Sequence, residues 1–325
     1  MIILRTRNVH RALPLGIALL ERTGIRQSSR GGKVCYESPE PVTTVYARPQ
    51  ERVVFWEARD ANPFFHLFES LHMLAGRRDV AWLTYYNARM REFSDDGVTF
   101  HGAYGHRWRS AFDRDQLVAL IQLLQREPDT RRAVLQMWHA PLDLGMDSLD
   151  LPCNTHAYFK VRDGALRMLV CCRSNDVVWG TYGANAVHFS MLQEYLADRL
   201  EVRVGPYTQV SDSFHAYEGV WEKLHGLPAT QLSPYEAGTV APFPLKAEEP
   251  GWDEDLQQAF VDPAQACRTE FFAGVFYPLF RAFESYKGGE FGRAFAQVQA
   301  CLASDWALAA REWLERRPSF VAATR

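Results

Sequence analysis

The most informative part of the chain reads Leu-Pro-Cys-Asn at residues 151–154, Arg-Ser-Asn-Asp at 173–176 and Trp-Gly-Thr-Tyr-Gly-Ala-Asn at 179–185. It combines a polarisable nucleophile, Cys153, with a guanidinium group, Arg173, and a polar run that opens an apolar helix. A thiolate can attack an electron-poor ring, and an arginine can hold an anionic group attached to that ring. These residues therefore predict an enzyme that acts on an anionic heterocyclic substrate.

The composition indicates a folded globular protein with a small-molecule partner. The chain has 325 residues, of which 47% are hydrophobic and 13% aromatic, and this excludes disorder. The net charge of −3 and the pI near 6.4 argue against a protein that binds nucleic acid nonspecifically, which usually carries a basic excess.

The sequence contains no pattern typical of a membrane span, a signal peptide, a redox-active cysteine pair or a zinc site. No apolar run approaches the roughly 20 residues of a membrane span, and residues 1–5 do not begin a signal peptide, so we expect a cytoplasmic protein. The six cysteines form neither a CxxC pair nor a cluster with histidines at zinc spacing. We expect free thiols and no metal.

The hydrophobic pattern predicts a single α+β domain without internal repeats or a clear linker. Helical spacing is present at residues 64–75, at 113–126 with Asp113 as N-cap, at 185–200, and over most of 266–317. Strands are predicted at residues 45–46, 53–55, 133–138, 157–161, 166–172 and 202–210. Asp163-Gly164 has the composition of a hairpin turn.

The motifs resemble those of the thymidylate synthase family, in which a Pro-Cys motif, an Arg-Ser-x-Asp motif and a helix-opening Asn follow one another in this order. The matches extend from Arg30 to Tyr217, and no gap is needed from Asn185 to His215. The resemblance implies an α+β fold with a large mixed β-sheet flanked by helices. Residues 1–260 would form the catalytic domain, and residues 261–325 a C-terminal helical extension packed on it.

The resemblance also implies a covalent mechanism. Cys153 would add to carbon 6 of a pyrimidine nucleotide, which makes carbon 5 nucleophilic toward the one-carbon unit of the co-substrate 5,10-methylenetetrahydrofolate. Glu69, the only acid in its helix, matches the family's buried glutamate, which moves protons through water. Tyr104 matches the Tyr of a Tyr-Gly-x-x-Trp-Arg segment near the nucleophile, and Asp176 matches an acid near the base and the folate.

Further matches concern the substrate's phosphate and sugar. Several guanidinium groups bind a phosphate well because each presents a planar fork of donors. The implied phosphate ligands are Arg30, Arg131, Arg132, Arg173 and the hydroxyl of Ser174, and the implied 3′-hydroxyl ligands are His215 and Tyr217. In the family the paired arginines reach the site of the partner subunit, so the resemblance implies a homodimer.

Identification of the base depends on the alignment near the helix start. The family's Asn reads uracil O4 and N3, whereas a carboxylate at that position reads cytosine. An ungapped count from Gly180 reaches Ala184, while the downstream match reaches Asn185 and needs one extra residue within 181–184. We prefer Asn185, and hence uracil.

Three departures from the synthases concern the last step of the reaction. Asn154 follows the nucleophile where synthases usually have His, residues 85–90 replace expected tryptophans, and the chain ends in a different tail at 318–325. A more polar and less closed site lets water, rather than hydride, add to the methylene group on carbon 5. We therefore expect a hydroxymethyltransferase acting on dUMP, for modified DNA or antibiotic nucleosides.

Other functions remain possible at this stage. They include a dCMP or CMP 5-hydroxymethylase, a divergent thymidylate synthase that makes dTMP, and a non-catalytic homologue that binds nucleotides or RNA. A cysteine hydrolase would need a histidine base such as His156 or His215, but no protease-like motif surrounds Cys153.

Overall fold

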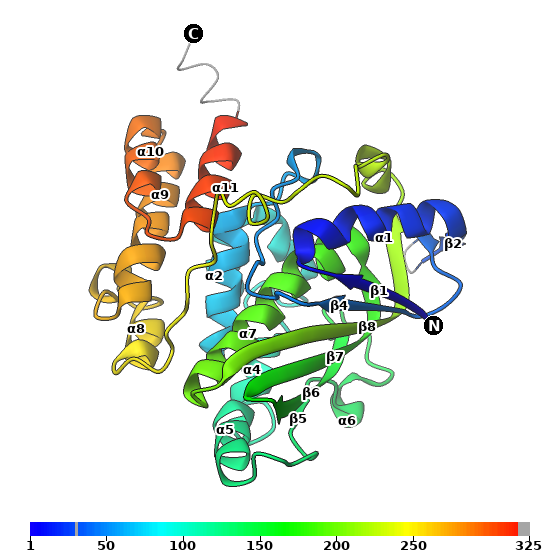
Figure 1. The fold of residues 1–325 in the computed structure, drawn as a ribbon, viewed down its shortest axis with the longest axis horizontal. Coiled ribbons are helices and arrows are strands. Elements are labelled where there is room, and N and C mark those ends of the chain that lie inside the picture. The colour runs from blue at the N-terminus through cyan, green and yellow to red at the C-terminus, as the bar shows by residue number, and fades with distance from the viewer. Residues whose placement is uncertain (30–31, 318–325) are drawn as a thin grey trace.

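A large mixed β-sheet forms the centre of the protein (Figure 1). The structure is a computed structural model, and it describes residues 1–29 and 32–317. The strands are β1 (Ile2–Thr6), β2 (Ile25–Ser28), β3 (Val34–Glu37), β4 (Val42–Tyr46), β5 (Val134–Gln136), β6 (Asn154–Arg162), β7 (Ala165–Asp176) and β8 (Arg203–Tyr217). Within the described residues the main order is β1-β4-β8-β7-β6-β5, with β3 also pairing with β8 and β2 with β3.

The two longest central strands, β7 and β8, run parallel and end at the same edge of the sheet. In β7 the buried side chains of Leu166, Met168 and Val170 alternate with more exposed ones, as expected for a strand with one covered face. The turn between β6 and β7 is formed by Asp163 and Gly164, whose φ angles of 54° and 65° suit a two-residue hairpin. The predicted hairpin is thus confirmed.

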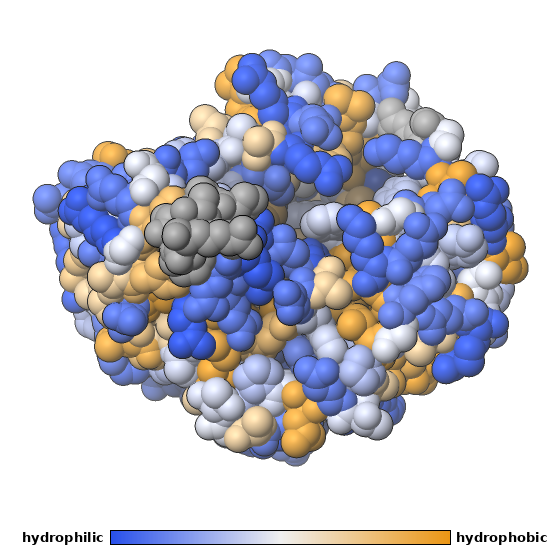
Figure 2. Space-filling view, turned by 90° about the horizontal axis from the view of Figure 1, so that it is seen from above, coloured by the Kyte–Doolittle hydropathy of each residue, from blue (hydrophilic) through white to orange (hydrophobic). Residues whose placement is uncertain are grey.

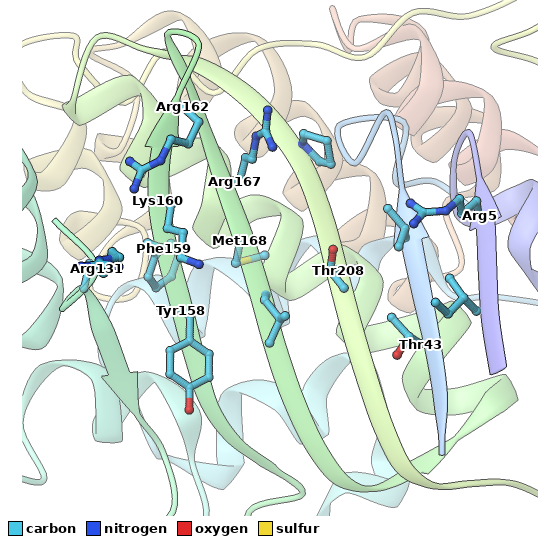
Figure 3. Close-up of a pocket in the computed structure, with 15 residues that line it drawn as sticks. Arg5, Thr43, Arg131, Tyr158, Phe159, Lys160, Arg162, Arg167, Met168 and Thr208 are labelled. Carbon is cyan, nitrogen blue, oxygen red and sulfur yellow. The ribbon is translucent and has the colours of Figure 1, made fainter. Parts of the chain in front are cut away.

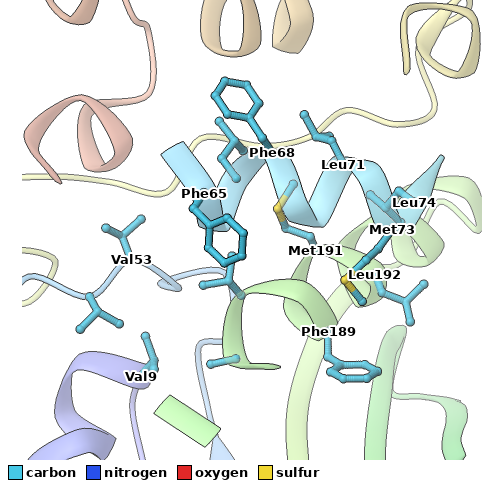
Figure 4. Packing of buried hydrophobic residues seen from close by; sticks show 14 of the residues in the cluster. Val9, Val53, Phe65, Phe68, Leu71, Met73, Leu74, Phe189, Met191 and Leu192 are labelled. Atoms are coloured by element: carbon cyan, nitrogen blue, oxygen red, sulfur yellow. The ribbon is translucent and has the colours of Figure 1, made fainter. Parts of the chain in front are cut away.

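Helices α1, α2 and α7 lie on one side of the sheet (Figure 1). The helices of residues 1–251 are α1 (Val9–Thr23), α2 (Pro63–Leu74), α3 (Val80–Tyr86), α4 (Tyr104–Arg109), α5 (Gln116–Arg126), α6 (Ala140–Asp143) and α7 (Asn185–Arg199). Short turns of other helical types are η2 (Glu57–Arg59), η3 (Ala88–Phe93), η4 (Val177–Ala184) and η5 (Trp221–Leu224). Every residue of α2 except Glu69 is buried, and apolar side chains of α2 and α7 pack together between the layers (Figure 4).

The C-terminal helices pack against the outer side of α2. They are α8 (Trp252–Gln258), η6 (Pro263–Gln265), η7 (Phe272–Phe276), α9 (Tyr277–Lys287), α10 (Phe291–Gln299) and α11 (Ser304–Glu315). The Phe64 ring lies 5.2 Å from that of Phe283 and 5.6 Å from that of Trp313, while Phe68 lies 5.5 Å from Phe276. These aromatic contacts join the helical extension to the same core as the sheet.

Side chains of β1, β4, β6, β7 and β8 line part of the other face of the sheet (Figure 3). It combines apolar and basic side chains around a hollow of about 970 Å³. Ile3 and Tyr158 are 53% and 39% exposed. The basic residues that line the hollow are Arg5, Arg131, Lys160, Arg162 and Arg167. We call this surface the open face.

Hydrophilic side chains cover much of the surface seen from above in Figure 2. Among residues 1–29 and 32–317, no helix has the length and apolar character that crossing a bilayer requires.

Two local predictions are wrong. The N-cap of α5 is Asp115, which accepts hydrogen bonds from the N–H groups of Leu117 and Val118, whereas Asp113 adopts a left-handed backbone with φ of 52°. Residues 53–55 do not form a strand, although Val53 and Val54 are buried. Their apolar pattern reflects packing against the core rather than pairing with another strand. The sequence pattern also did not indicate α1.

Candidate active site

Cys153 lies immediately before β6, and Tyr104 holds its backbone in place. The Tyr104 hydroxyl accepts hydrogen bonds from the N–H groups of Cys153 (3.0 Å) and Asn154 (2.9 Å). The next residue, Gly105, allows α4 to approach α2, because a Cβ atom there would lie 2.3 Å from the carbonyl oxygen of Met73. This explains why Gly follows Tyr here: the close approach of α4 to α2 at Gly105 places the Tyr104 hydroxyl next to the backbone of Cys153.

The thiol of Cys153 is partly buried beside a guanidinium group. Arg173 donates to the carbonyl oxygens of Pro152 (3.0 Å) and Leu151 (3.1 Å), and its Nη2 lies 3.9 Å from Cys153 Sγ. Burial raises the pKa of the Cys153 thiol, and the Arg173 charge acts in the opposite direction. A positive charge at this position is the kind of group that favours the thiolate form of a cysteine.

A chain of buried amides connects the nucleophile loop to the start of α7. Asn154 Nδ2 donates to the Tyr104 hydroxyl (3.0 Å) and lies 3.1 Å from Asn185 Oδ1. Asn185 Nδ2 donates to Asn175 Oδ1 (3.0 Å), and Asn175 Nδ2 donates to Ser211 Oγ (2.9 Å). Each amide fixes the orientation of the next, so the Asn185 side chain is preorganised.

The segment before α7 can accommodate the extra residue that the choice of Asn185 requires. Val177–Ala184 forms a wide helical turn that is irregular at Tyr182 (φ −109°, ψ 29°) and Gly183 (φ −138°, ψ −114°). A Cβ atom on Gly183 would lie 2.8 Å from the carbonyl oxygen of Val178. Regular helix resumes at Asn185, whose side chain belongs to the chain of amides described above.

Asp176 caps this turn and has one free carboxylate oxygen. Its Oδ1 accepts hydrogen bonds from the N–H groups of Val178 (2.8 Å) and Trp179 (2.6 Å). Its Oδ2 is buried without a hydrogen-bond partner in the described residues, and burial raises the pKa of the carboxyl. The half-exposed Trp179 ring beside it lies 4.4 Å from the Arg59 guanidinium and 5.9 Å from that of Arg89.

The ends of β7 and β8 bring the predicted sugar and phosphate ligands together. Ser174 is opposite Ser213, and Asp176 is opposite His215 in the parallel pairing. His215 Nδ1 lies 3.1 Å from Ser213 Oγ, and its ring is 5.3 Å from that of Tyr217. Parallel strands that end at one edge thus place the Arg-Ser-x-Asp motif beside the His-x-Tyr motif.

Glu69 and Tyr104 line one small cavity of about 120 Å³, together with Asp150. Glu69 Oε2 also lies 2.9 Å from His188 Nε2 on α7. His188 is not among the residues predicted from the sequence. Its position three residues after Asn185, on the same face of the helix, is the signal that would have found it.

The paired arginines lie elsewhere in the described subunit. Arg131 lines the open face, and Arg132 is an exposed ion-pair partner of Glu127. Neither takes part in the hydrogen bonds around Cys153 described above. Arg30 falls outside the described residues, so its predicted role has no structural counterpart here.

Comparison with known proteins gives concordant matches. A model of the family described as thymidylate synthase matches residues 51–236. The deoxyuridylate hydroxymethyltransferase of Pseudomonas phage M6 is 48% identical over 333 residues, covering 98% of this chain and 95% of the phage protein. The protein of the same name from Bacillus phage SP01 is 43% identical over 188 residues, which is 54% of this chain and 49% of that protein. A putative thymidylate synthase of Methanosarcina barkeri is 34% identical over 39% of this chain and 58% of its own length.

Proposed function

Because this chain belongs to the thymidylate synthase family, we propose that it is a deoxyuridylate hydroxymethyltransferase, which adds a one-carbon unit and then water at carbon 5 of dUMP. The observation that carries the proposal is the 48% identity to the M6 enzyme over 98% of this chain. The active-site geometry supports it, because Cys153, Arg173, Tyr104 and Asn185 lie in one connected network.

In the proposed mechanism Cys153 Sγ attacks carbon 6 of the uracil ring, and the electrons of the C5=C6 bond move onto carbon 5 and O4. Arg173 is placed to stabilise the attacking thiolate and to bind the 5′-phosphate with Ser174. Asn185 offers one amide oxygen and one amide nitrogen, which match uracil N3–H and O4. His215 and Tyr217 at the end of β8 would bind the 3′-hydroxyl.

The residues present fit a folate co-substrate. The free Oδ2 of Asp176 is a buried acceptor that suits the N–H groups of a pterin ring, and Trp179 offers an aromatic surface beside it. When bound, 5,10-methylenetetrahydrofolate supplies the carbon that becomes a methylene group on carbon 5. Asp176 and Trp179 would hold the folate against the nucleotide.

Polar groups near Cys153 favour water over hydride in the last step. Asn154 replaces the usual histidine, and its Oδ1 is buried without a partner among the described residues. Glu69 borders the cavity of about 120 Å³, and a water takes up about 30 Å³ of liquid volume. The site therefore has room and acceptors for a water that adds to the methylene carbon.

We further propose that two subunits pair through the open face. Exposed apolar side chains such as Ile3 and Tyr158, side by side with basic residues on the open face, are typical of a subunit interface. Arg131 lies on this surface, so pairing would direct it toward the partner. In this arrangement Arg131 and Arg132 would complete the phosphate site of the other subunit.

The proposed function is tested by mass spectrometry of the products. The protein is incubated separately with dUMP, dCMP and CMP, each with 5,10-methylenetetrahydrofolate in water enriched in ¹⁸O. We expect 5-hydroxymethyl-dUMP that contains solvent oxygen, and tetrahydrofolate as the second product. Cys153→Ser is the control variant: it should bind dUMP but form no product and release no tritium from carbon 5.

A methyl product with an equal amount of dihydrofolate would instead identify a divergent thymidylate synthase. A product only from dCMP or CMP would reassign the base or the sugar.

A further inference from the structure

His188 and Glu69 form a buried pair between the helices α7 and α2. His188 Nε2 lies 2.9 Å from Glu69 Oε2, and the two side chains are 4% and 13% exposed. The separation is that of a hydrogen bond, but neither atom has a hydrogen bond of good geometry with any described residue, the other atom included. Buried polar atoms are normally hydrogen-bonded, and each of these two atoms is the polar atom that the other could bond, as donor and acceptor, once the two side chains are aligned.

Two other titratable groups, His66 and Arg59, lie near this pair, and neither takes the place of His188 as the partner of Glu69. His66 lies one helical turn before Glu69, and burial holds its pKa well below the usual range, with Arg59 and His188 acting in the same direction. Arg59 donates to the carbonyl oxygen of Val178, and burial lowers its pKa to about 10, so it stays charged at neutral pH. His66 carries no positive charge that would attract Glu69, and Arg59 already donates to Val178. His188 is therefore the partner of the Glu69 carboxylate.

The pair also connects two parts of the active site. His188 follows Asn185 by three residues on α7, and Glu69 borders the small cavity that Tyr104 also lines. With Oε2 held by the imidazole, Oε1 is the carboxylate oxygen that remains for a water in that cavity. Histidine is well suited to this task because its N–H can donate to a carboxylate while the ring stays neutral.

We propose that His188 is a positioning residue for the addition of water: it holds the Glu69 carboxylate in the orientation that removes a proton from the attacking water. This inference rests on the proposed hydroxymethyl transfer and assigns a role to a residue outside the motifs of the sequence.

The proposed step balances as follows. The water oxygen forms a bond to the methylene carbon, one water proton passes to Glu69, and the electrons of the C5=CH₂ bond move onto carbon 5 and O4. Those electrons then restore the C5=C6 bond as the bond from carbon 6 to Cys153 Sγ breaks. The proton on Glu69 returns through solvent to the departing thiolate. Both the carboxylate and the thiol are thereby regenerated.

The test compares two variants of His188, of which one can donate a hydrogen bond to Glu69 and the other cannot. His188→Gln keeps an N–H donor, whereas His188→Leu removes it and keeps an apolar side chain of comparable size. Met191→Ala is the control for lost packing, because Met191 is buried on the same helix but is not part of the pair. For each protein, tritium release from carbon 5 of dUMP and formation of 5-hydroxymethyl-dUMP are measured together, with thermal melting as a check of folding.

We expect His188→Leu to lower kcat for the hydroxymethyl product about ten- to a hundredfold, as loss of a group that orients a catalytic residue does, with KM for dUMP changed less than about threefold. Tritium release should fall less than product formation, so their ratio should rise above that of the wild type. His188→Gln should recover most of kcat, and Met191→Ala should keep the wild-type ratio.

Equal loss of both signals in His188→Leu, an unchanged kcat, or no recovery in His188→Gln would overturn the role of His188 while leaving the proposed function intact. A wild-type protein that makes no hydroxymethyl product would overturn the proposed function and this inference with it.

Discussion

At the scale of single residues, the orientation of Asn185 is set by its neighbours before a substrate arrives. Asn154 contacts its oxygen and Asn175 accepts from its nitrogen, which leaves one acceptor site and one N–H for the base. If Asn185 contacts the base as proposed, this preorganisation would favour uracil over cytosine, because the two bases reverse the donor and acceptor at N3 and at position 4.

Asn185→Asp should therefore shift the preference from dUMP toward dCMP. A mismatched buried polar pair costs about 1–3 kcal/mol, so the ratio of the two kcat/KM values should change by roughly ten- to a hundredfold. The ratio is measured with each nucleotide at saturating folate. An unchanged ratio would mean that Asn185 does not read the base, and that Ala184 or backbone groups face it.

Most site residues predicted from the sequence lie in short, dense motifs, and Glu69 was predicted because it is the only acid in its helix. Cys153, Arg173 and Asp176 lie within 24 positions of one another, where residue order alone is informative. His188 and Glu69 are separated by more than a hundred positions, and they meet only because α2 and α7 pack together. Trp179 was part of a recognised motif, but its position between Arg59 and Arg89 depends equally on tertiary packing.

At the scale of elements, the C-terminal end of α7 carries a carboxyl group that titrates near neutrality. Asp198 accepts a hydrogen bond from the N–H of Ala247 (3.0 Å), and burial, then Glu194 and Glu248, raise the pKa of this carboxyl to about 7. The corresponding pKa in the unfolded chain is about 3.9. The folded protein thus binds this proton more tightly than the unfolded chain, and the stability this provides is complete below pH 4 and lost as the pH rises to about 7.

Asp198→Asn should remove this dependence. An amide oxygen still accepts from Ala247 but carries no charge, so the variant should be more stable than the wild type at pH 8 by about 1–2 kcal/mol, and similar to it near pH 4. The free energy of unfolding is measured by urea denaturation at both pH values. Asp129→Asn, at an exposed position, is the control; a variant with the pH dependence of the wild type would show that Asp198 does not cause it.

Long, strongly periodic helices and the β6–β7 hairpin could be predicted, because their patterns are local. The N-cap of α5 was predicted two residues too early, since Asp113 and Asp115 are both suitable caps and only the backbone decides between them. Residues 53–55 have the composition of a strand, but no strand of the described residues pairs with them. A segment forms a strand only where the fold places another strand next to it, and the local sequence does not determine this.

At the scale of the whole molecule, the proposed dimer would have active sites that draw residues from both subunits. Arg131→Ala and Cys153→Ser should each be inactive or nearly so as homodimers. After subunit exchange, a mixed dimer has one site with an intact Cys153 and an intact partner arginine. Since half of the dimers are mixed and each has one working site of two, activity should return to about one quarter of the wild-type level.

The measurement is turnover of dUMP after exchange, with the mixed dimer verified by native mass spectrometry. Arg126→Ala, an exposed arginine on α5, is the control, because it should remain active without exchange. No recovery in verified mixed dimers would show that each subunit binds phosphate with its own arginines.

The position of α2 between two layers has a consequence for how this chain could be shortened. Glu69 lies on its active-site side, while Phe64 and Phe68 contact the aromatic rings of η7, α9 and α11. The segment matched by the family model ends at residue 236, before any of those helices. A fragment cut there would expose the aromatic side of α2, the helix that carries Glu69. We therefore expect that a chain shortened at this point would lose the packing that holds α2, and with it the position of Glu69, so the C-terminal helices support the active site from behind.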